Sequence, residues 1–393
     1  MNSAHAPWIY LTCALVLAGC SKPPATEAKS SAPTKPIVKT ASTTKAATAS
    51  AESPMPTFTA PDHVRGIYLT AWSGGSKKKV DNTLAMFKRT GLNTVVIDIR
   101  DSGQMYVKTG LKLADESHAN MIAISHPKEL IRKLAAAGVY PIARVACFRD
   151  NYVPVKHPEL AVQLANGKPW KDHSGHMWLD PYTTANWDYI GSVVDFAMEQ
   201  GFPEIQLDYV RFPSEGKAST QVFPGKKKFH DPKAKPEDVI EEFAKAMRDK
   251  VKKQGKAISA DIFGIISSSH SDQGIGQELE KVAEPFDVIS PMVYPSHFAK
   301  GEYGIKDPNA SPYEIVKKSL TDYQKRLPNK HIRPWLQDFS LGRKYGADEV
   351  IAQIKAASEC GYNDYLLWNA GNKYTEAAHT KKSAKVADKS AAH

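Results

Sequence analysis

The sequence alternates strand-like and helix-like segments along most of its length, and this alternation limits the folds open to the chain. Strand-like runs lie at 65–72, 94–100, 140–147, 204–210, 257–263, 288–294, 332–339 and 365–369. Segments of helical periodicity lie between them, at 80–90, 127–137, 185–200, 236–254, 275–285, 312–327 and 347–360. Strands that alternate with helices indicate βαβ units and a parallel sheet. Eight such units predict an α/β fold, the (β/α)8 TIM barrel.

A doubly wound open sheet is the alternative architecture for the same alternation. That fold usually carries a Gly-rich phosphate-binding turn after its first strand. Here Ser73-Gly74-Gly75-Ser76 follows the first strand-like run, and it lacks the G-x-G-x-x-G spacing. The sequence therefore favours the barrel, although a helix after the eighth strand is weak or missing.

The first twenty residues predict an export signal. The apolar run that ends before Cys20 is too short to span a bilayer and is typical of a signal peptide. Residues 17–20, Leu-Ala-Gly-Cys, resemble the lipobox of bacterial lipoproteins, in which the cysteine carries lipid. An ordinary cleaved signal is the alternative, because no Lys or Arg precedes the run. We expect an exported lipoprotein, anchored through Cys20 to the cell envelope on the periplasmic or outer-membrane face.

Low-complexity segments flank the predicted barrel domain, residues 61–374. Of the 40 residues in 21–60, 34 are Ala, Ser, Thr, Pro or Lys. Such a segment cannot bury enough apolar surface to offset the entropy lost when it becomes ordered. We expect a disordered linker at 21–60 and a basic flexible tail at 375–393. The net charge is +10, but 21–60 and 371–393 carry +3 each, which leaves +4 for 61–370. A net charge this small over residues 61–370 does not predict a nucleic-acid-binding surface.

The remaining cysteines and histidines predict neither a disulfide framework nor a metal centre. Cys147 and Cys360 are the two cysteines left after the signal and the lipid site, and we expect two separate buried thiols. His173, His270 and His297 have no zinc-binding spacing such as H-E-x-x-H. We expect no metal and no cofactor.

Charged residues lie on the strand face that should point into the barrel. Side chains of a strand alternate between two faces. In the fourth predicted strand Ile205 and Leu207 should pack against helices, which directs Asp208 toward the axis, near the end where the strands finish. The fifth strand repeats the pattern and places Asp261 likewise. We call this end of the barrel the mouth, and it is where the active sites of such barrels lie.

The second and third predicted strands add charges in the same phase. Asp98 and Arg100 should point inward from the second strand, and Arg144 from the third. A charged side chain inside a barrel needs an oppositely charged or hydrogen-bonding partner, or a water-filled pocket. A structural salt bridge from Asp208 to Arg144 or Arg211 is therefore the alternative to a catalytic role for Asp208.

Two neighbouring carboxylates suit glycoside hydrolysis. One must be ionised to act as nucleophile or base, and the other must hold a proton for the leaving oxygen. Two like charges held close together raise one of the two pKa values. Asp208 precedes Arg211, which favours its ionised form, and Asp261 has apolar neighbours, which should raise its pKa. Adjacent strands are ~4.8 Å apart, so we expect a short carboxyl separation and retention of configuration.

Motifs that span residues 64 to 374 carry a family resemblance. They lie at 64–72, 95–101, 178–182, 204–213, 259–264, 289–297, 333–338 and 366–369. With them the chain resembles a bacterial family of putative glycosyl hydrolases, long catalogued as a domain of unknown function and assigned a TIM-barrel fold. The resemblance implies the barrel and a reaction class, but no substrate.

The resemblance also implies roles for particular residues. Related α-amylase-like barrels place a nucleophilic Asp at the end of the fourth strand and the acid at the end of the fifth, which match Asp208 and Asp261 by position. The usual Arg two residues before the nucleophile is Gln206 here, so Arg144 or Arg211 should replace it. Asp338 is the reserve for the acid. The residues expected to bind substrate are Trp72, Asp98, Arg144, Arg211, Tyr294, His297, Gln337, Asp338, Trp368 and Asn369.

The predicted function is hydrolysis of a bacterial cell-wall or extracellular polysaccharide by a monomeric enzyme. A non-catalytic glycan-binding lipoprotein on the same scaffold is the alternative, and transglycosylation would use the same carboxylates. A binding protein requires a stacking groove but no acid–base pair. Because a fold does not determine a function, the geometry of the mouth decides between them.

Overall fold

Parallel strands close into a ring in the computed structural model, which describes residues 54–379. Strand β1 (Arg65–Leu69) pairs with both β2 (Thr94–Asp101) and β10 (Tyr365–Trp368), so the sheet has no open edge there. The ring continues through β4 (Tyr140–Ala146), β5 (Glu204–Asp208), β6 (Ala257–Phe263), β7 (Val288–Met292), β8 (His331–Ile332) and β9 (Trp335–Gln337). Because β8 and β9 together form one barrel strand, the ring has eight strands. The predicted TIM barrel is confirmed, and the open sheet is excluded.

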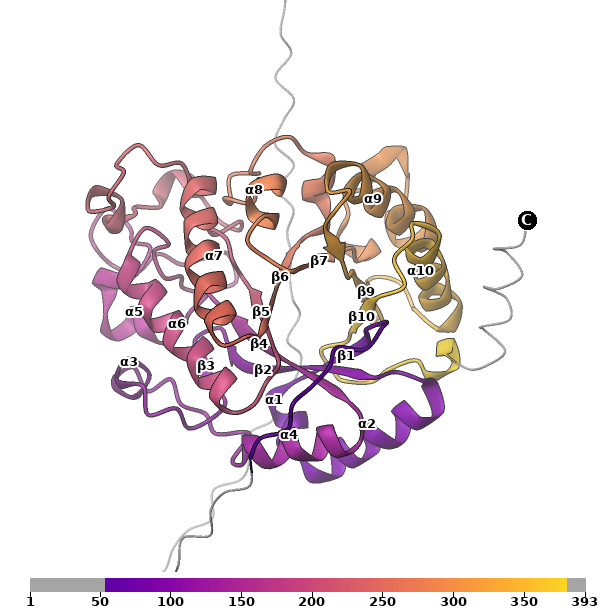
Figure 1. Cartoon of the computed structure of the whole chain (residues 1–393). Coiled ribbons are helices and arrows are strands. Elements are labelled where there is room, and N and C mark those ends of the chain that lie inside the picture. The colour runs from indigo at the N-terminus through magenta and orange to yellow at the C-terminus, as the bar shows by residue number, and fades with distance from the viewer. Residues whose placement is uncertain (1–53, 380–393) are drawn as a thin grey trace, which may run out of the picture.

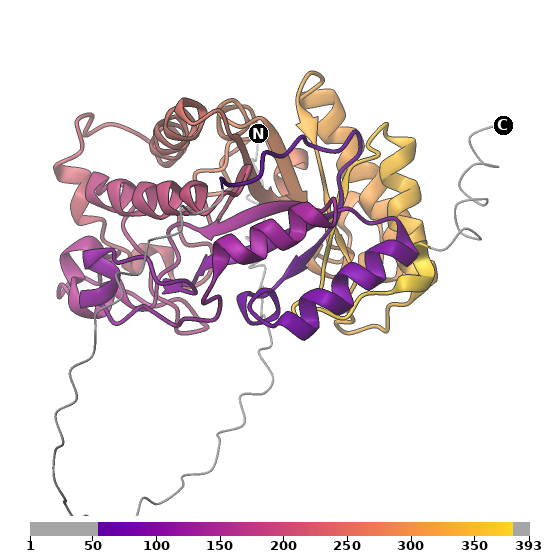
Figure 2. The ribbon, with the colours of Figure 1, turned by 60° about the horizontal axis from the view of Figure 1, so that its bottom comes forward.

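Helices follow the strands and cover the outside of the ring, while the strands occupy the centre (Figure 1). The long ones are α2 (Lys77–Thr90), α4 (Pro127–Ala136), α6 (Thr184–Glu199), α7 (Pro236–Lys253), α9 (Pro312–Arg326) and α10 (Ala347–Glu359). The short ones are α1 (Ala71–Gly74), α3 (Lys112–Glu116), α5 (Val153–Lys156) and α8 (Leu279–Ala283). Figure 2 shows α2 and α4, in indigo and violet, side by side. After β10 the described chain forms only the 3-10 turn η8 (Glu376–His379).

Several elements end earlier than their sequence pattern predicts, each for a local reason. Strand β1 stops at Leu69 because the Thr70 side chain caps α1. Strand β5 stops at Asp208 because Tyr209 adopts a left-handed conformation, with φ of 51°. The predicted strand 332–339 is split at Pro334, which has no N–H for the ladder.

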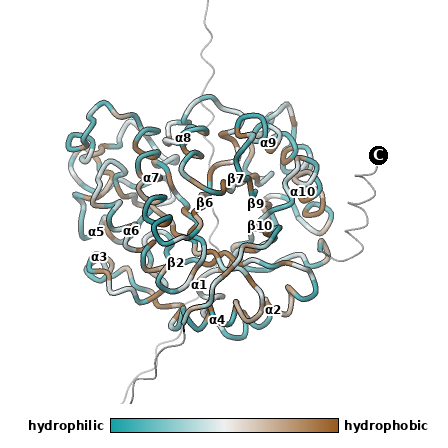
Figure 3. Tube along the Cα trace, viewed as in Figure 1, coloured by the Kyte–Doolittle hydropathy of each residue, from teal (hydrophilic) through white to brown (hydrophobic). Residues whose placement is uncertain are grey.

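The core has two layers. Apolar side chains on the outer face of the strands pack against the helices, and a smaller cluster fills the inside of the ring. Hydrophobic residues, brown in Figure 3, accordingly gather toward the centre. At the end of the ring where the strands begin, here called the floor, Glu204 and Arg333 form a buried ion pair that also binds Ser259. The floor is thus closed by polar contacts, and the mouth lies at the opposite end.

The ends of the described chain pack on the barrel. The last residues of the predicted linker are not all unpacked, because Met55 contacts Gly201 and Phe58 lies edge-on to Tyr140 at the floor. At the other end Glu376 pairs with Arg89 of α2. The other residues of the predicted linker and tail, the predicted signal peptide and Cys20 lie outside the described residues.

Two further observations bear on the expectations from sequence. Cys147 and Cys360 are both buried free thiols, as predicted. In residues 54–379, no helix has the length and apolar character needed to cross a membrane.

Candidate active site

Arg144 lies at the centre of the mouth and joins carboxylates from the strands on either side. It stands on β4, and the register places Asp98 of β2 beside it. Its Nη1 donates to Asp98 Oδ1 at 2.6 Å, and its Nη2 and Nε donate to Asp208 Oδ2 at 2.6 and 3.0 Å. All three side chains are buried. Arg144 therefore occupies the place beside Asp208 that Gln206 leaves without a cation.

Asp208 accepts hydrogen bonds on both of its carboxyl oxygens. Besides the two bonds from Arg144, its Oδ1 accepts the backbone N–H of Tyr209 at 2.6 Å. The left-handed turn at Tyr209 follows Asp208 directly, and such backbone strain in a non-glycine residue is typical of functional sites. Three N–H donors, two of them on the Arg144 guanidinium, therefore surround the Asp208 carboxyl, as suits a nucleophile or base.

Asp261 lies in a different environment, two residues before the end of β6. Its Oδ1 accepts from Trp335 Nε1 at 2.6 Å and from Gln206 Nε2 at 2.5 Å. Its Oδ2 is 4.0 Å from Arg144 Nε and only 2 % of the residue is exposed. Burial and the charge of Asp208 raise the pKa of Asp261 well above its usual value. The two carboxyls therefore differ in the way that a base and an acid require.

The separation of the two carboxyls is bounded by the nitrogen that lies between them. Because Arg144 Nε is 3.0 Å from Asp208 Oδ2 and 4.0 Å from Asp261 Oδ2, these oxygens are at most 7.0 Å apart. A pair about 5–5.5 Å apart supports retention of configuration, and a pair about 6.5–9.5 Å apart supports inversion. Distances of up to 7.0 Å between these oxygens include the whole range for retention but only the shortest distances for inversion.

Asp98 holds Arg144 from the other side. Its Oδ2 accepts the Tyr68 hydroxyl at 2.5 Å. Burial raises the pKa of Asp98 to about 6, against the opposing effect of Arg144. Asp98 and Tyr68 thus fix the guanidinium whose other edge binds Asp208.

Aromatic rings surround this network. Trp368 stacks on Tyr68 with ring centroids 4.0 Å apart, and the Arg144 guanidinium lies 5.4 Å from the Trp368 ring. Trp72, in the short helix after β1, is 54 % exposed. His297 packs edge-on against Tyr294, and burial lowers the pKa of His297 to about 4, so this ring is neutral at pH 7. Among them, the exposed Trp72 ring offers an apolar face of the kind on which sugars stack.

Four predicted substrate-binding residues have side chains that are engaged within the protein. Gln337 accepts from Ser296 N and donates to Phe339 O, at 3.0 and 2.9 Å. Asp338 binds both the backbone N–H and the hydroxyl of Thr375. The other two hold loops in the same way. These are Asn369, which donates to Asp338 O and Lys373 O, and Arg211, which donates to Phe212 O and Ser214 Oγ.

Arg100 does not share the inward phase of Asp98, contrary to the sequence pattern. The β2–β4 register shifts between Asp98 and Arg100. A bulge of this kind turns the following side chain to the other face. Arg100 instead binds Asp150 and lies 5.4 Å from the ring of Tyr189, which belongs to α6 on the outside of the barrel.

Sequence reasoning missed three residues of the site. Tyr68 could have been found from strand phase, since Ile67 and Leu69 occupy the outer face of β1. Asp101 ends β2, after its register shift, and pairs at 3.5 Å with Arg149, which lies in the loop after β4. The Arg149 guanidinium lies 3.8 Å from the Tyr209 ring. No periodic signal predicts such loop contacts.

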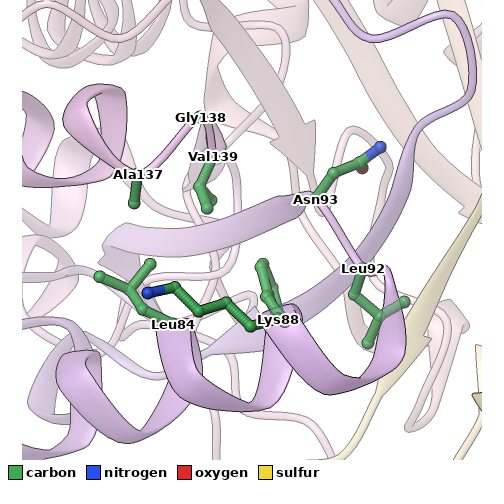
Figure 4. Close-up of a pocket in the computed structure, with 8 residues that line it drawn as sticks. Leu84, Lys88, Leu92, Asn93, Ala137, Gly138 and Val139 are labelled. Carbon is green, nitrogen blue, oxygen red and sulfur yellow. The ribbon is translucent and has the colours of Figure 1, made fainter.

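A hollow at the floor is separate from this site. It has a volume of about 180 Å³ and lies between α2 and the turn after α4 (Figure 4). Leu84, Lys88, Leu92 and Val139 are among its lining residues, and no carboxylate lines it. Across residues 54–379 we find no group of three or more His, Cys, Asp or Glu side chains arranged to hold a metal ion.

Solved structures that align with this barrel include glycoside hydrolases. The PgaB (BpsB) glycoside hydrolase domain from Bordetella bronchiseptica aligns with a TM-score of 0.61 at 12 % identity, covering 83 % of this chain and 98 % of that one. An exo-β-N-acetylglucosaminidase from Vibrio harveyi aligns with a TM-score of 0.52 at 12 % identity, covering 84 % of this chain and 57 % of its own. An α-galactosidase from Thermus thermophilus aligns with a TM-score of 0.50 at 11 % identity, covering 85 % of this chain and 62 % of that one. At such identities the likeness shows the fold alone.

The sequence itself places the chain in a family. Residues 66–374 match the family described as "Putative glycosyl hydrolase domain", and the chain belongs to it. A comparison with curated proteins gives no match. Membership of this family supports a glycosidase-like function.

Proposed function

We propose that the protein is a glycoside hydrolase that cleaves a bacterial cell-wall or extracellular polysaccharide, with Asp208 as nucleophile or base and Asp261 as general acid. One observation carries the assignment. Arg144 bonds Asp208 directly but stays 4.0 Å from Asp261, so one carboxyl has a bonded cation and the other does not. A glycosidase needs this asymmetry between its two carboxyls.

The proposed chemistry is the retaining mechanism, which the upper bound on the carboxyl separation permits. Asp208 attacks the anomeric carbon while Asp261 donates its proton to the departing glycosidic oxygen, which leaves a glycosyl ester on Asp208. Asp261, now a carboxylate, then removes a proton from water as the water attacks the same carbon. This step releases the sugar with its original configuration and restores both groups.

Arg144 has a positioning role in this scheme. Asp98 and Tyr68 hold the guanidinium, and its Nη2–H and Nε–H orient Asp208. As the glycosyl ester forms, Asp208 loses its negative charge. If Arg144 stabilised the free carboxylate too strongly, it would raise the barrier to forming this ester. The Asp98 carboxylate also pairs with Arg144 and so weakens its electrostatic attraction for Asp208.

The envelope location is part of the proposal. A lipid on Cys20 would hold the enzyme close to cell-wall and capsular polymers. Both members of the proposed catalytic pair lie on one polypeptide, so a monomer can carry out the reaction. Metabolic labelling with a fatty acid, followed by mass spectrometry of the mature N-terminus, tests the anchor. Loss of the label in Cys20→Ala is the expected result, and an unlabelled N-terminus in the wild type would contradict it.

A second candidate is a glycan-binding protein without catalysis. Asp261 is only 2 % exposed while Trp72 is 54 % exposed, so a sugar could stack on the rim without reaching the acid. This candidate predicts binding that survives Asp208→Asn with no bond cleavage.

A release assay separates the two functions. Purified protein is incubated with a panel of bacterial glycans, and new reducing ends are measured for the wild type and for Asp208→Asn. Hydrolysis by the wild type that falls at least about 10²-fold in the variant supports the enzyme. Binding without release in both proteins would establish the glycan-binding function instead.

A further inference from the structure

Tyr294 carries a phenol hydroxyl that the protein does not use. The residue follows β7 at the mouth and is only 6 % exposed. Its ring is packed inside the barrel, 5.3 Å from His297 and 5.6 Å from Phe339 between ring centroids. The ring is therefore fixed in place, and so is the direction of its hydroxyl.

The Tyr294 hydroxyl has no hydrogen-bond partner among residues 54–379. Its oxygen is not fully enclosed, so a molecule from solvent can reach it. Other inward phenols at this end are paired, since the Tyr68 hydroxyl donates to Asp98 and that of Tyr374 to Tyr68 O. Buried polar groups are almost always hydrogen-bonded, and a Tyr hydroxyl usually finds a partner. A fixed, reachable and unpaired donor at the mouth indicates a partner that comes from outside the chain.

The surroundings of the hydroxyl identify the chemistry. After burial, the charges of Asp261 and Asp208 are the main causes that raise the pKa of Tyr294 well above its usual value. The phenol thus stays protonated, within electrostatic range of both carboxyls, and can donate a hydrogen bond.

We infer that the Tyr294 hydroxyl donates a hydrogen bond to an oxygen atom of the sugar residue bound next to Asp208 and Asp261, and so fixes that sugar for cleavage. The inference rests on the proposed function and adds a third group to it. The ligand class is a glycan with a neutral ring, hydroxyl or carbonyl oxygen as acceptor at the cleavage point.

Tyr294→Phe tests this inference cleanly. The substitution removes no hydrogen bond within the protein, so the melting temperature should equal that of the wild type. On a hydrolysed glycan, kcat/KM should fall about tenfold, the usual effect of one lost donor. Tyr140→Phe is the matched control, because it removes an equally buried phenol beside Glu204 at the floor. It should leave kcat/KM unchanged, whereas equal kcat/KM for Tyr294→Phe and the wild type would overturn the inference.

A second readout separates this inference from the proposed function. Protein labelled with 13C at the tyrosine Cζ gives one signal per tyrosine, and the Tyr294 signal is identified by its loss in Tyr294→Phe. Titration of Asp208→Asn with each glycan of the panel should shift the Tyr294 signal but not that of Tyr140. A shift without hydrolysis by the wild type would support the inference and refute the hydrolase. Hydrolysis without a shift would refute the inference alone, and neither effect would contradict both.

Discussion

The guanidinium of Arg144 binds the Asp208 carboxylate through two nitrogens, at 2.6 and 3.0 Å to the same oxygen. This contact crosses from β4 to β5, and Asp98 of β2 holds the other edge of the guanidinium. The network is buried, so each charge depends on the others. Asp261 lies just outside this set of bonded charges, and the division of roles proposed for the two carboxyls rests on that position.

Arg144→Met should lower both stability and activity. It leaves Asp98 and Asp208 as buried carboxylates without their cation, and removing one partner of a buried pair costs about 3–5 kcal/mol. Urea unfolding measures the free energy of unfolding. The triple variant Arg144→Met, Asp98→Asn, Asp208→Asn should recover part of the loss, because no buried charge is then left unpaired. A stability equal to that of the wild type for Arg144→Met alone would contradict the network.

Asp261→Asn should remove the basic limb of the pH–rate profile. The raised pKa of Asp261 keeps it protonated at low and moderate pH, and activity is lost as pH rises through that pKa. In the variant, a glycan should react about 10²–10⁴-fold more slowly. An aryl glycoside whose leaving group needs no proton should lose much less, and its rate should no longer fall with rising pH. A basic limb that persists in Asp261→Asn on the aryl glycoside would place the acid elsewhere.

His297→Gln should weaken the loss of stability in acid. Burial lowers the pKa of His297 to about 4, below the value of about 6.5 for a free side chain. The unfolded chain therefore takes up a proton first, so the stability from neutral His297 is present above pH 6.5 and is lost as pH falls toward 4. In that window the slope of unfolding free energy should drop by up to ~1.4 kcal/mol per pH unit. An unchanged slope between pH 6.5 and 4 would show that His297 is not buried as described.

His379 provides an independent comparison at another site. Burial lowers its pKa to about 4 as well, and it stacks on Tyr365 at the start of β10. His379→Gln should change the slope in the same direction, and the double variant should show the sum of both changes. At pH 8, where the ring is neutral in both states, the slopes of all four proteins should agree.

Glu204→Gln should affect stability but not catalysis. Glu204 pairs with Arg333 at the floor, at the end of the ring away from Asp208. Breaking this buried pair should cost about 3–5 kcal/mol, measured by urea unfolding. The kcat/KM of the folded variant, measured well below its melting temperature, should equal that of the wild type. A kcat/KM reduced as far as in Asp208→Asn would show that the floor takes part in catalysis.

Strand phase explains why much of the site was predictable from the sequence. Alternation along β5 and β6 places Asp208 and Asp261 on the inner face, and the closed parallel ring brings their strand ends together. Arg144 was predictable for the same reason. The interior phase holds wherever the ladder is regular, so the residues of β4, β5 and β6, and those of β2 up to Asp98, are placed well.

Prediction failed where the backbone leaves the regular ladder. The register shift before Arg100 turns that side chain outward. The roles of Gln337 and Asn369 depend on loop partners such as Ser296 and Lys373, which no periodicity encodes. The left-handed Tyr209, which supplies a donor to Asp208, also has no signal in the sequence, because such a conformation is rare for a non-glycine residue.

Rescue by azide tests the central claim most directly, that Asp208 and Asp261 divide the roles of nucleophile and acid. On an activated aryl glycoside, Asp208→Ala with azide should regain turnover and give a glycosyl azide of inverted configuration, because azide attacks the sugar from the side that Asp208 occupied. Asp261→Ala with azide should give the glycosyl azide of retained configuration, because azide attacks the ester on Asp208. Proton NMR of the anomeric signal reads both products. Azides of the same configuration from both variants, or full wild-type turnover in either variant without azide, would contradict the assignment.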